Sequence, residues 1–214
     1  MTEILYQDDY IVICKKESGM LSEESATEES LPFILKQELQ TDIFTLHRLD
    51  KPVGGVMVYA KTKKAAAEFS KMIASDGLCK KYLAVLDAVP EKDKDELSDF
   101  LFKDSRKNKV FVVKKMRKGV KEASLTYRTL DKTDNHALVE IELKTGRSHQ
   151  IRVQFASRKM PLTGDGKYGS RDNRCNVSLF SHSISFIHPF TKKEMAFSCN
   201  PDYSQYPWNL FKTE

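Results

Sequence analysis

The apolar segments of this chain are mostly β-like, and they do not alternate regularly with helical ones. Residues 4–6 and 10–14 are rich in β-branched and aromatic side chains and flank a short polar turn, which indicates two adjacent strands. Apolar residues recur at helical spacing over 31–39 and from 62 to about 75, where Thr62 is a suitable N-cap. Further strands are expected at residues 56–60, 82–86, 110–113, 123–130, 137–143, 178–186 and 194–198, with a charged connection over 90–96. Because there is no βα repeat, the pattern predicts an α+β fold with a mixed, mostly antiparallel sheet and two or three helices.

The length and composition favour one folded domain. A chain of 214 residues can bury one large core, so a single domain over residues 1–214 is expected. Hydrophobic residues make up 40% of the chain and charged residues 30%, a balance that differs from that of a disordered protein. The net charge of +5 favours polyanionic partners without identifying one.

The sequence gives no sign of a metal site, a leader segment or a membrane anchor. Its four cysteines form no CxxC pair, whereas zinc sites need closely spaced ligands. The N-terminus lacks a basic segment before an apolar one, and no apolar run approaches the roughly 20 residues that cross a bilayer. We therefore expect a cytoplasmic protein with reduced cysteines, no bound metal and no membrane contact.

His47, Arg48, Leu49 and Asp50 place charged side chains between two apolar segments. Such a cluster is typical of the edge of a core, where a buried carboxylate must be matched by a fixed cation or lose its charge. The alternative is an aspartate at a strand end that pairs locally with Arg48, a surface arrangement of small energetic value. The residues alone leave both interpretations open.

Two basic segments are candidates for phosphate binding. Gly146 and Arg147 precede a predicted helix over residues 149–157, which Ser148 would cap, and a helix N-terminus favours anions. Residues 103–121 form the second segment, and cations along a hairpin fit a phosphate backbone. Solvated surface charge is the alternative for both segments. The basic residues of the second segment are Lys103, Arg106, Lys107, Lys109, Lys114, Lys115, Arg117, Lys118 and Lys121.

Two other patterns are interpreted as structural. Residues 164–169 match GxGxxG, but dinucleotide binding needs a strand before the glycines and a helix after them. Here a predicted helix and Pro161 precede, and polar residues follow, so a glycine-rich turn is expected. The five histidines lack the spacing of metal ligands, and each is expected to be structural.

Three motifs together resemble those of the RluA-type RNA pseudouridine synthases. The first is HRLD at residues 47–50, followed by Gly55 and an apolar strand. The second is KKYLAV at residues 80–85, and the third is GRSHQIRV at residues 146–153, followed by PLTGD at 161–165. Residues 5–12 and 181–189 also fit, so the resemblance spans nearly the whole chain with its motifs in order.

The resemblance implies a pseudouridine synthase fold, which is a mixed, mostly antiparallel sheet with a central catalytic cleft and a few flanking helices. It implies an isomerase that breaks the N1–C1′ bond of a uridine in RNA, turns the uracil and rejoins it through C5, with no metal or organic cofactor. Asp50 would be the essential carboxylate, Tyr82 would pack against the uracil, and Arg152 would keep Asp50 charged through an ion pair. A stacked uridine cannot present its glycosidic bond, so the base must be extruded.

The same resemblance assigns RNA contacts. Arg48 would fill the space that the extruded base leaves, and Arg147 would contact phosphate together with Lys107, Lys109, Lys114 and Lys115. The expected partner is a stem-loop of ribosomal or transfer RNA, bound by a monomer. The S4-type RNA-binding domain of many relatives is not seen ahead of the first motif, so RNA capture would rest on the catalytic domain and depend strongly on salt.

One departure and two alternatives remain. Val53 and Gly54 stand where the family commonly has Thr-Ser, which removes two hydroxyls near the loop of Asp50. A non-catalytic RNA-binding protein that retains the fold is the first alternative, although Asp50, Tyr82 and Arg152 are all present. A glycosidase is the second, and it would need a second acidic residue as its partner carboxylate, which the sequence does not identify.

Overall fold

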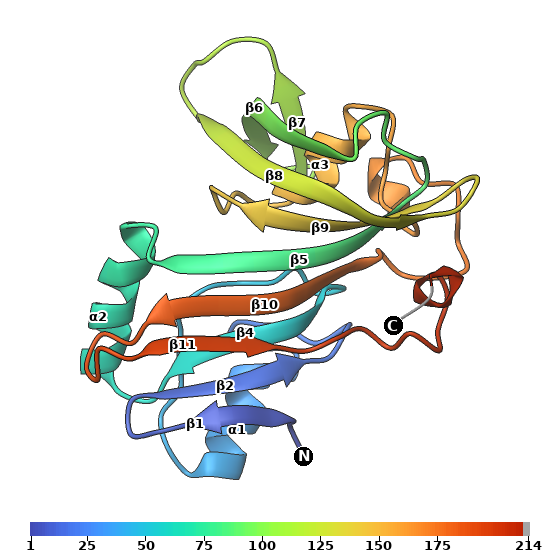
Figure 1. The fold of residues 1–214 in the computed structure, drawn as a ribbon. Coiled ribbons are helices and arrows are strands. Elements are labelled where there is room, and N and C mark those ends of the chain that lie inside the picture. The colour runs from blue at the N-terminus through green and yellow to red at the C-terminus, as the bar shows by residue number, and fades with distance from the viewer. Residues whose placement is uncertain (212–214) are drawn as a thin grey trace. The chain divides into compact units, whose positions relative to one another are not determined.

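Eleven β-strands, three α-helices and two short 3₁₀ helices make up residues 1–211, which the computed structural model describes (Figure 1). They fall into two units. The first unit joins Met1–Lys80 to Phe180–Pro201, and the second joins Lys81–Leu179 to the chain from Asp202 onward. The first unit is therefore assembled from segments that lie about a hundred residues apart in the sequence.

The first unit is a sheet with two helices. β2 pairs antiparallel with both β1 and β4, β10 joins β4 in parallel, β11 pairs antiparallel with β10, and the short β3 pairs with the end of β4. The helix α2 packs on β3 and β4, and the hydroxyl of Thr62 caps it by accepting a hydrogen bond from the amide of Ala65 (3.1 Å). The elements are β1 (Ile4–Gln7), β2 (Ile11–Lys16), α1 (Leu31–Leu39), β3 (Phe44–Thr45), β4 (Gly54–Ala60), α2 (Lys63–Ala74), β10 (Leu179–Ile187) and β11 (Glu194–Ser198).

The second unit is an antiparallel sheet in the order β5-β9-β8-β6-β7, with the short helix α3 packed against β6 and β7 (Figure 1). Long hairpins dominate it, since β6 and β8 pair over nine consecutive positions. The elements are β5 (Leu78–Leu86), β6 (Lys94–Asp104), β7 (Lys109–Val113), β8 (Val120–Lys132), β9 (Ala137–Leu143), α3 (Gln150–Ala156), η1 (Gly166–Tyr168) and η2 (Trp208–Leu210).

Each unit buries its own apolar clusters. In the first unit, strand residues such as Ile11 and Val58 pack with Phe69 of α2 and Phe186 of β10. In the second unit, one cluster joins the β6–β7 hairpin to α3, and another joins β5 and β9 to the chain end. The second unit's clusters consist of Leu101, Val110, Ala123, Val153 and Tyr168, and of Leu83, Val85, Leu138 and Phe211.

The predicted α+β class with a mostly antiparallel sheet is confirmed, and so are the helices at 31–39 and after Thr62. The prediction of a charged connection over 90–96 was wrong in part, because β6 begins at Lys94. The single domain over 1–214 stays a prediction, and its last three residues lie outside the described part. Within residues 1–211, no helix is both long and apolar enough to cross a bilayer.

Candidate active site

Asp50 lies half-buried in the loop between β3 and β4 of the first unit, on a backbone that is fixed by neighbouring groups. The buried Leu49 exchanges two hydrogen bonds with Ser22: its carbonyl accepts from the hydroxyl (2.8 Å), and its amide donates to it (3.2 Å). The amide of Val53 donates to the carbonyl of Asp50 (2.9 Å) and closes a turn. The carboxylate is therefore carried by a well-tethered loop rather than by a free one.

A buried lysine stands close to this loop. Lys16 is fully buried at the end of β2, and its ammonium donates to the carbonyls of Glu17 (3.0 Å), Met20 (2.7 Å) and Lys51 (3.1 Å). Burial lowers the pKa of Lys16 to about 8, and the negative charge of Asp50 opposes this shift. Lys16 is thus a fixed cation in the electrostatic surroundings of Asp50, and the sequence analysis did not find it.

His47 ties the same loop to β4. Its Nε2 accepts a hydrogen bond from the amide of Val58 (3.2 Å). Burial lowers the pKa of His47 to about 3, and the charge of Lys80 acts in the same direction. The imidazole is therefore neutral at ordinary pH and acts as a structural acceptor.

Two glycines allow the backbones behind Asp50 to approach closely. Gly55 has φ +119°, and a Cβ built on it would lie 2.2 Å from the carbonyl oxygen of Ser181 in β10. At Gly54 a Cβ would lie 3.1 Å from the carbonyl oxygen of Lys16 and 3.3 Å from the ring of Phe180. Gly54 is part of the departure from the family's common Thr-Ser, and here it fits a narrow space between β2 and β10.

The two cations beside Asp50 pair with the acidic loop at residues 22–30. Arg48 donates to Glu23 (2.8 Å), and Lys51 forms an ion pair with Glu28. All four side chains are about half exposed, so each pair contributes little to stability. Arg48 therefore has a carboxylate partner in the first unit that the sequence analysis did not predict.

Tyr82 lies on β5 in the second unit, opposite Ile141 of β9, and only 6% of its surface is exposed. The β5 backbone is hydrogen-bonded to β9 on both sides of this position. Tyr82 is therefore a buried aromatic residue on a fixed strand, a setting that holds a ring in one orientation.

Arg152 lies on α3 and is held by Asp165 within the second unit. Its Nε and Nη2 donate to the two carboxylate oxygens of Asp165 (2.7 Å and 2.8 Å), which is a bidentate pair with both residues buried. The guanidinium also lies 5.1 Å from the ring centroid of Tyr168. Asp165 ends the PLTGD segment that follows the third motif, but no role was predicted for it or for Tyr168, because residues 164–169 were interpreted as a glycine-rich turn.

The hydroxyl of Tyr168 connects three segments of the second unit. It accepts a hydrogen bond from the amide of Val110 in β7 (2.9 Å) and lies 2.8 Å from Nδ1 of His149. The ammonium of Lys109 lies 5.3 Å from the Tyr168 ring. The structure therefore brings two predicted site residues, Arg152 and Lys109, to the same aromatic ring.

The predicted start of the third helix was wrong. The N-cap is His149, in a left-handed conformation and without a side-chain cap, and α3 begins at Gln150. Buried Gln150 accepts from the amide of Arg147 (3.0 Å) and donates to the carbonyl of Ser124 (3.1 Å). Arg147 itself is exposed, and its Nε donates to the carbonyl of Glu122 (2.9 Å). A helix of seven residues whose first turn is closed by Gln150 gives no separate support for anion binding there.

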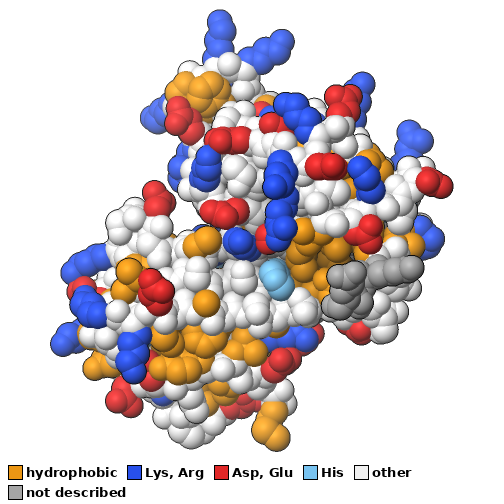
Figure 2. Space-filling view, in the orientation of Figure 1, with side chains coloured by type: hydrophobic (Ala, Val, Ile, Leu, Met, Phe, Trp, Pro, Cys, Tyr) orange, Lys and Arg blue, Asp and Glu red, His pale blue; other side chains and the backbone are white. Residues whose placement is uncertain are grey.

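The basic segment 103–121 forms two linked turns at the end of the β6–β7–β8 hairpins. Phe102 and Phe111 pair across β6 and β7, and Arg117 lies 5.3 Å from the Phe102 ring. Figure 2 shows basic side chains around an apolar one at the end of this part of the second unit, uppermost in the view. Lys107, Lys114 and Lys115 are exposed in the turns, as phosphate contacts require.

Comparisons with known proteins place these motifs in context. The family model described as RNA pseudouridylate synthase matches residues 9–157. The chain is 27% identical to tRNA pseudouridine synthase C of Vibrio parahaemolyticus, over 97% of this chain and 96% of that protein. It is 32% identical to ribosomal large subunit pseudouridine synthase C of Buchnera aphidicola subsp. Baizongia pistaciae, over 98% of this chain and 68% of that protein.

Solved structures support the fold. Human RNA pseudouridylate synthase domain containing 4 superposes with a TM-score of 0.77 at 23% identity, covering 94% of this chain and 89% of that one. The human domain containing 1 gives a TM-score of 0.80 at 20% identity, covering 97% of this chain and 86% of that one. At these identities the likeness concerns the fold alone.

Proposed function

Because the chain belongs to the RNA pseudouridylate synthase family, and is thus an RNA pseudouridine synthase, we propose that it converts a uridine of transfer or large-subunit ribosomal RNA to pseudouridine with Asp50 as its essential carboxylate. The observation that carries this proposal is the set of three motifs, which lie in order within the matched residues 9–157. In the proposed reaction the N1–C1′ bond of the uridine breaks, the uracil turns, and C5 bonds to C1′ before its proton leaves.

The surroundings of Asp50 support its role. A nucleophile or base needs a charged carboxylate, and desolvation works against the charge. The fixed ammonium of Lys16 attracts the Asp50 carboxylate, and the tethers at Leu49 and Val53 reduce the reorganisation that the reaction would need. Lys16 is a positioning residue in this proposal, because its hydrogen bonds go to backbone carbonyls and not to the substrate.

Tyr82 and Arg152 complete the proposed catalytic set, because they lie in the second and third motifs. A buried ring on a fixed strand suits Tyr82 for packing against a uracil and for assisting removal of the C5 proton. The Asp165 pair fixes the plane of the Arg152 guanidinium, so this cation is oriented before RNA binds. We propose Arg152 as the cation that keeps Asp50 charged during the reaction.

RNA capture is proposed to rest on Arg48, Arg147 and the basic turns. The uridine has to leave the RNA stack, and Arg48 is proposed to fill the space that the extruded base leaves. Its pair with Glu23 is exposed and weak, so the guanidinium can exchange that carboxylate for RNA. Lys107, Lys109, Lys114 and Lys115 are assigned to phosphates, which gives affinity without sequence specificity. A stem-loop of transfer or ribosomal RNA is the proposed target.

Release of tritium tests the chemistry. Total cellular RNA that carries tritium at uridine C5 is treated with the wild type, with Asp50→Asn, and with Asp9→Asn as a control at an exposed aspartate. We expect release by the wild type and the control, and a loss of more than about 1,000-fold for Asp50→Asn, the scale of removing an essential catalytic group. If Asp50→Asn releases tritium at the wild-type rate, the assignment of Asp50 is wrong.

The same assay separates the enzyme from a binding protein and tests Arg152. A wild type that binds RNA but releases no tritium from total RNA would favour the non-catalytic alternative. Arg152→Ala is expected to lose tritium release much more than RNA affinity, because its proposed role is electrostatic support of the reaction. An equal loss of both would show that Arg152 serves binding instead.

A further inference from the structure

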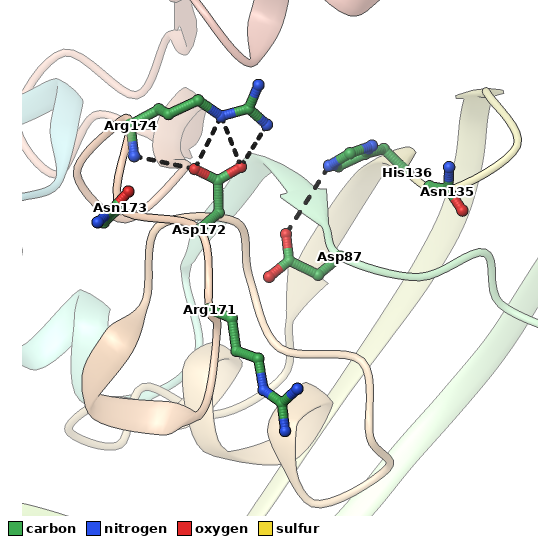
Figure 3. A pocket seen from close by; sticks show the side chains of 7 residues that line it. All are labelled: Asp87, Asn135, His136, Arg171, Asp172, Asn173 and Arg174. Carbon is green, nitrogen blue, oxygen red and sulfur yellow. Dashed lines mark hydrogen bonds and ion pairs between the residues drawn. The ribbon is translucent and has the colours of Figure 1, made fainter.

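A polar pocket lies entirely within the second unit and contains none of the residues predicted from the motifs. It has a volume of about 400 Å³, and Figure 3 shows the seven side chains that line it. They come from three places: the end of β5, the loop between β8 and β9, and the loop after η1. The lining residues are Asp87, Asn135, His136, Arg171, Asp172, Asn173 and Arg174. The volume is within the range of small-ligand sites, which is enough for a single nucleotide.

Protein donors satisfy Asp172 fully but Asp87 only in part. Asp172 accepts from Arg174 (2.6 Å from Nη2) and from the hydroxyl of Tyr206, and these bonds hold the pKa of Asp172 well below its usual range. Asp87 accepts from the hydroxyl of Ser170 (2.6 Å), and its other oxygen lies 3.9 Å from Nε2 of His136. Asp172 therefore belongs to the pocket wall, whereas Oδ1 of Asp87 has no hydrogen-bond partner among the described residues.

The donors in the pocket suit an anion. Arg171 is exposed, forms no ion pair with any residue in 1–211, and extends away from the Arg174–Asp172 pair (Figure 3). The exposed amides of Asn135 and Asn173 add neutral donors. No group of three or more His, Cys, Asp or Glu residues in the described chain is arranged to hold a metal ion. The chemistry therefore favours an oxygen-rich anion such as a phosphodiester.

Arg174 supplies a flat surface for a base. Its guanidinium carbon lies 4.0 Å from the ring centroid of Tyr206, and Asp172 fixes the guanidinium from its edge. Since 64% of the Arg174 side chain is exposed, the face away from Tyr206 is open to solvent. Bases of single-stranded RNA stack on guanidinium planes as well as on aromatic rings.

We propose that this pocket binds one nucleotide of the RNA substrate other than the modified uridine, with its phosphate on Arg171 and its base stacked on Arg174. The proposal rests on the proposed function only in taking RNA as the partner. Because a phosphate contact and a stacking contact do not read the edge of a base, these two contacts are independent of base identity. The pocket would give the enzyme a second RNA-binding site, separate from the basic turns of residues 103–121.

Three variants test the pocket. Arg171→Gln removes the phosphate contact, Arg174→Lys keeps the charge but removes the planar surface, and Lys193→Gln removes one exposed charge from the β10–β11 turn as a control. Affinity for unmodified transfer RNA transcripts is measured against salt, together with KM and kcat for tritium release. Each variant must have the same thermal unfolding midpoint as the wild type. If Arg174→Lys unfolds at a lower temperature, the affinity of Arg171→Gln alone tests the proposal.

We expect Arg171→Gln to weaken binding about 3- to 10-fold and to reduce the slope of log K against log salt by about 1. Arg174→Lys should weaken binding at least about 5-fold with the slope unchanged, since stacking and not charge is lost. In both variants, KM rises and kcat at saturating RNA stays at the wild-type value.

If both variants bind RNA like the control, the pocket proposal is wrong even with an active wild type. A wild type that releases no tritium contradicts the proposed function instead, and the affinities still decide the pocket.

Discussion

At His47 a partly buried imidazole accepts a backbone hydrogen bond, which makes the stability of the first unit sensitive to acid. The folded-state pKa is about 3, against an ordinary value of 6.5. Between these values the unfolded chain binds a proton that the folded chain does not bind, so stability rises with pH in this window. The contribution of His47 is complete above pH 6.5 and is lost as the pH falls toward 3.

His47→Gln is expected to reduce this acid sensitivity. The glutamine amide can still accept from Val58, but it does not titrate. In urea denaturation between pH 4 and 6.5, the free energy of unfolding of the wild type should fall more steeply with acid than that of the variant, by up to about 1.4 kcal/mol per pH unit. Parallel curves for the two proteins would contradict the role assigned to this imidazole.

Lys16 and the pairing of Asp165 were missed in the sequence for the same reason. Lys16 follows an apolar run and looks like the first exposed residue after a strand, yet three backbone carbonyls converge on it. Asp165 ends the PLTGD segment, but it lies thirteen residues from the arginine that it holds, so the segment did not reveal the pair. Asp50, Tyr82 and Arg152 were named from motifs, because motifs are local in sequence. Partners brought together by the fold leave no such local signal.

At the level of elements, the acidic loop 22–30 would compete with RNA for the cations next to Asp50 if Arg48 contacts RNA as proposed. It pairs with Arg48 through Glu23 and with Lys51 through Glu28. An RNA phosphate that approaches Arg48 or Lys51 has to displace a carboxylate. Exposed pairs contribute roughly 0–1 kcal/mol each, so we expect the loop to weaken RNA binding without preventing it.

Neutralising the paired glutamates should therefore tighten RNA binding. The double variant Glu23→Gln, Glu28→Gln is expected to bind RNA up to about 10-fold more tightly at 0.05 M salt, with the gain lost at 0.5 M salt because of screening. Its control is Glu24→Gln, Glu29→Gln, which changes the same loop by the same charge at two exposed residues. Filter binding measures both. Equal gains for the two variants would mean that only the net charge of the loop matters.

Strands and helices were predicted well where apolar residues repeat, and poorly where charge interrupts the repeat. β6 carries six charged residues in eleven, so its first residues resembled a loop, although its cross-strand neighbours on β8 hold it in the sheet. The start of α3 was misplaced by one residue because Gln150, rather than a serine, satisfies the preceding turn. In both cases tertiary contacts outweigh local preference.

For the whole molecule, a net charge of +5 understates the attraction to RNA, because nine cations gather in residues 103–121. Replacing Lys107, Lys109, Lys114 and Lys115 by glutamine should reduce the slope of log K against log salt by about 3, at about 0.7–0.9 per lost phosphate contact. The matched control replaces four exposed lysines of the first unit, Lys63, Lys64, Lys192 and Lys193. Similar slopes for the two variants would contradict a localised RNA contact.

The division of the first unit between two distant segments has a consequence for its synthesis. β4 receives its parallel neighbour β10 only from residue 179 onward, and β11 follows at Glu194. A ribosome that has released residues 1–80 has therefore not yet supplied two of the strands of this sheet. The loop that carries Asp50 is among the first parts of the chain to leave the ribosome, and the sheet behind it is among the last to be completed.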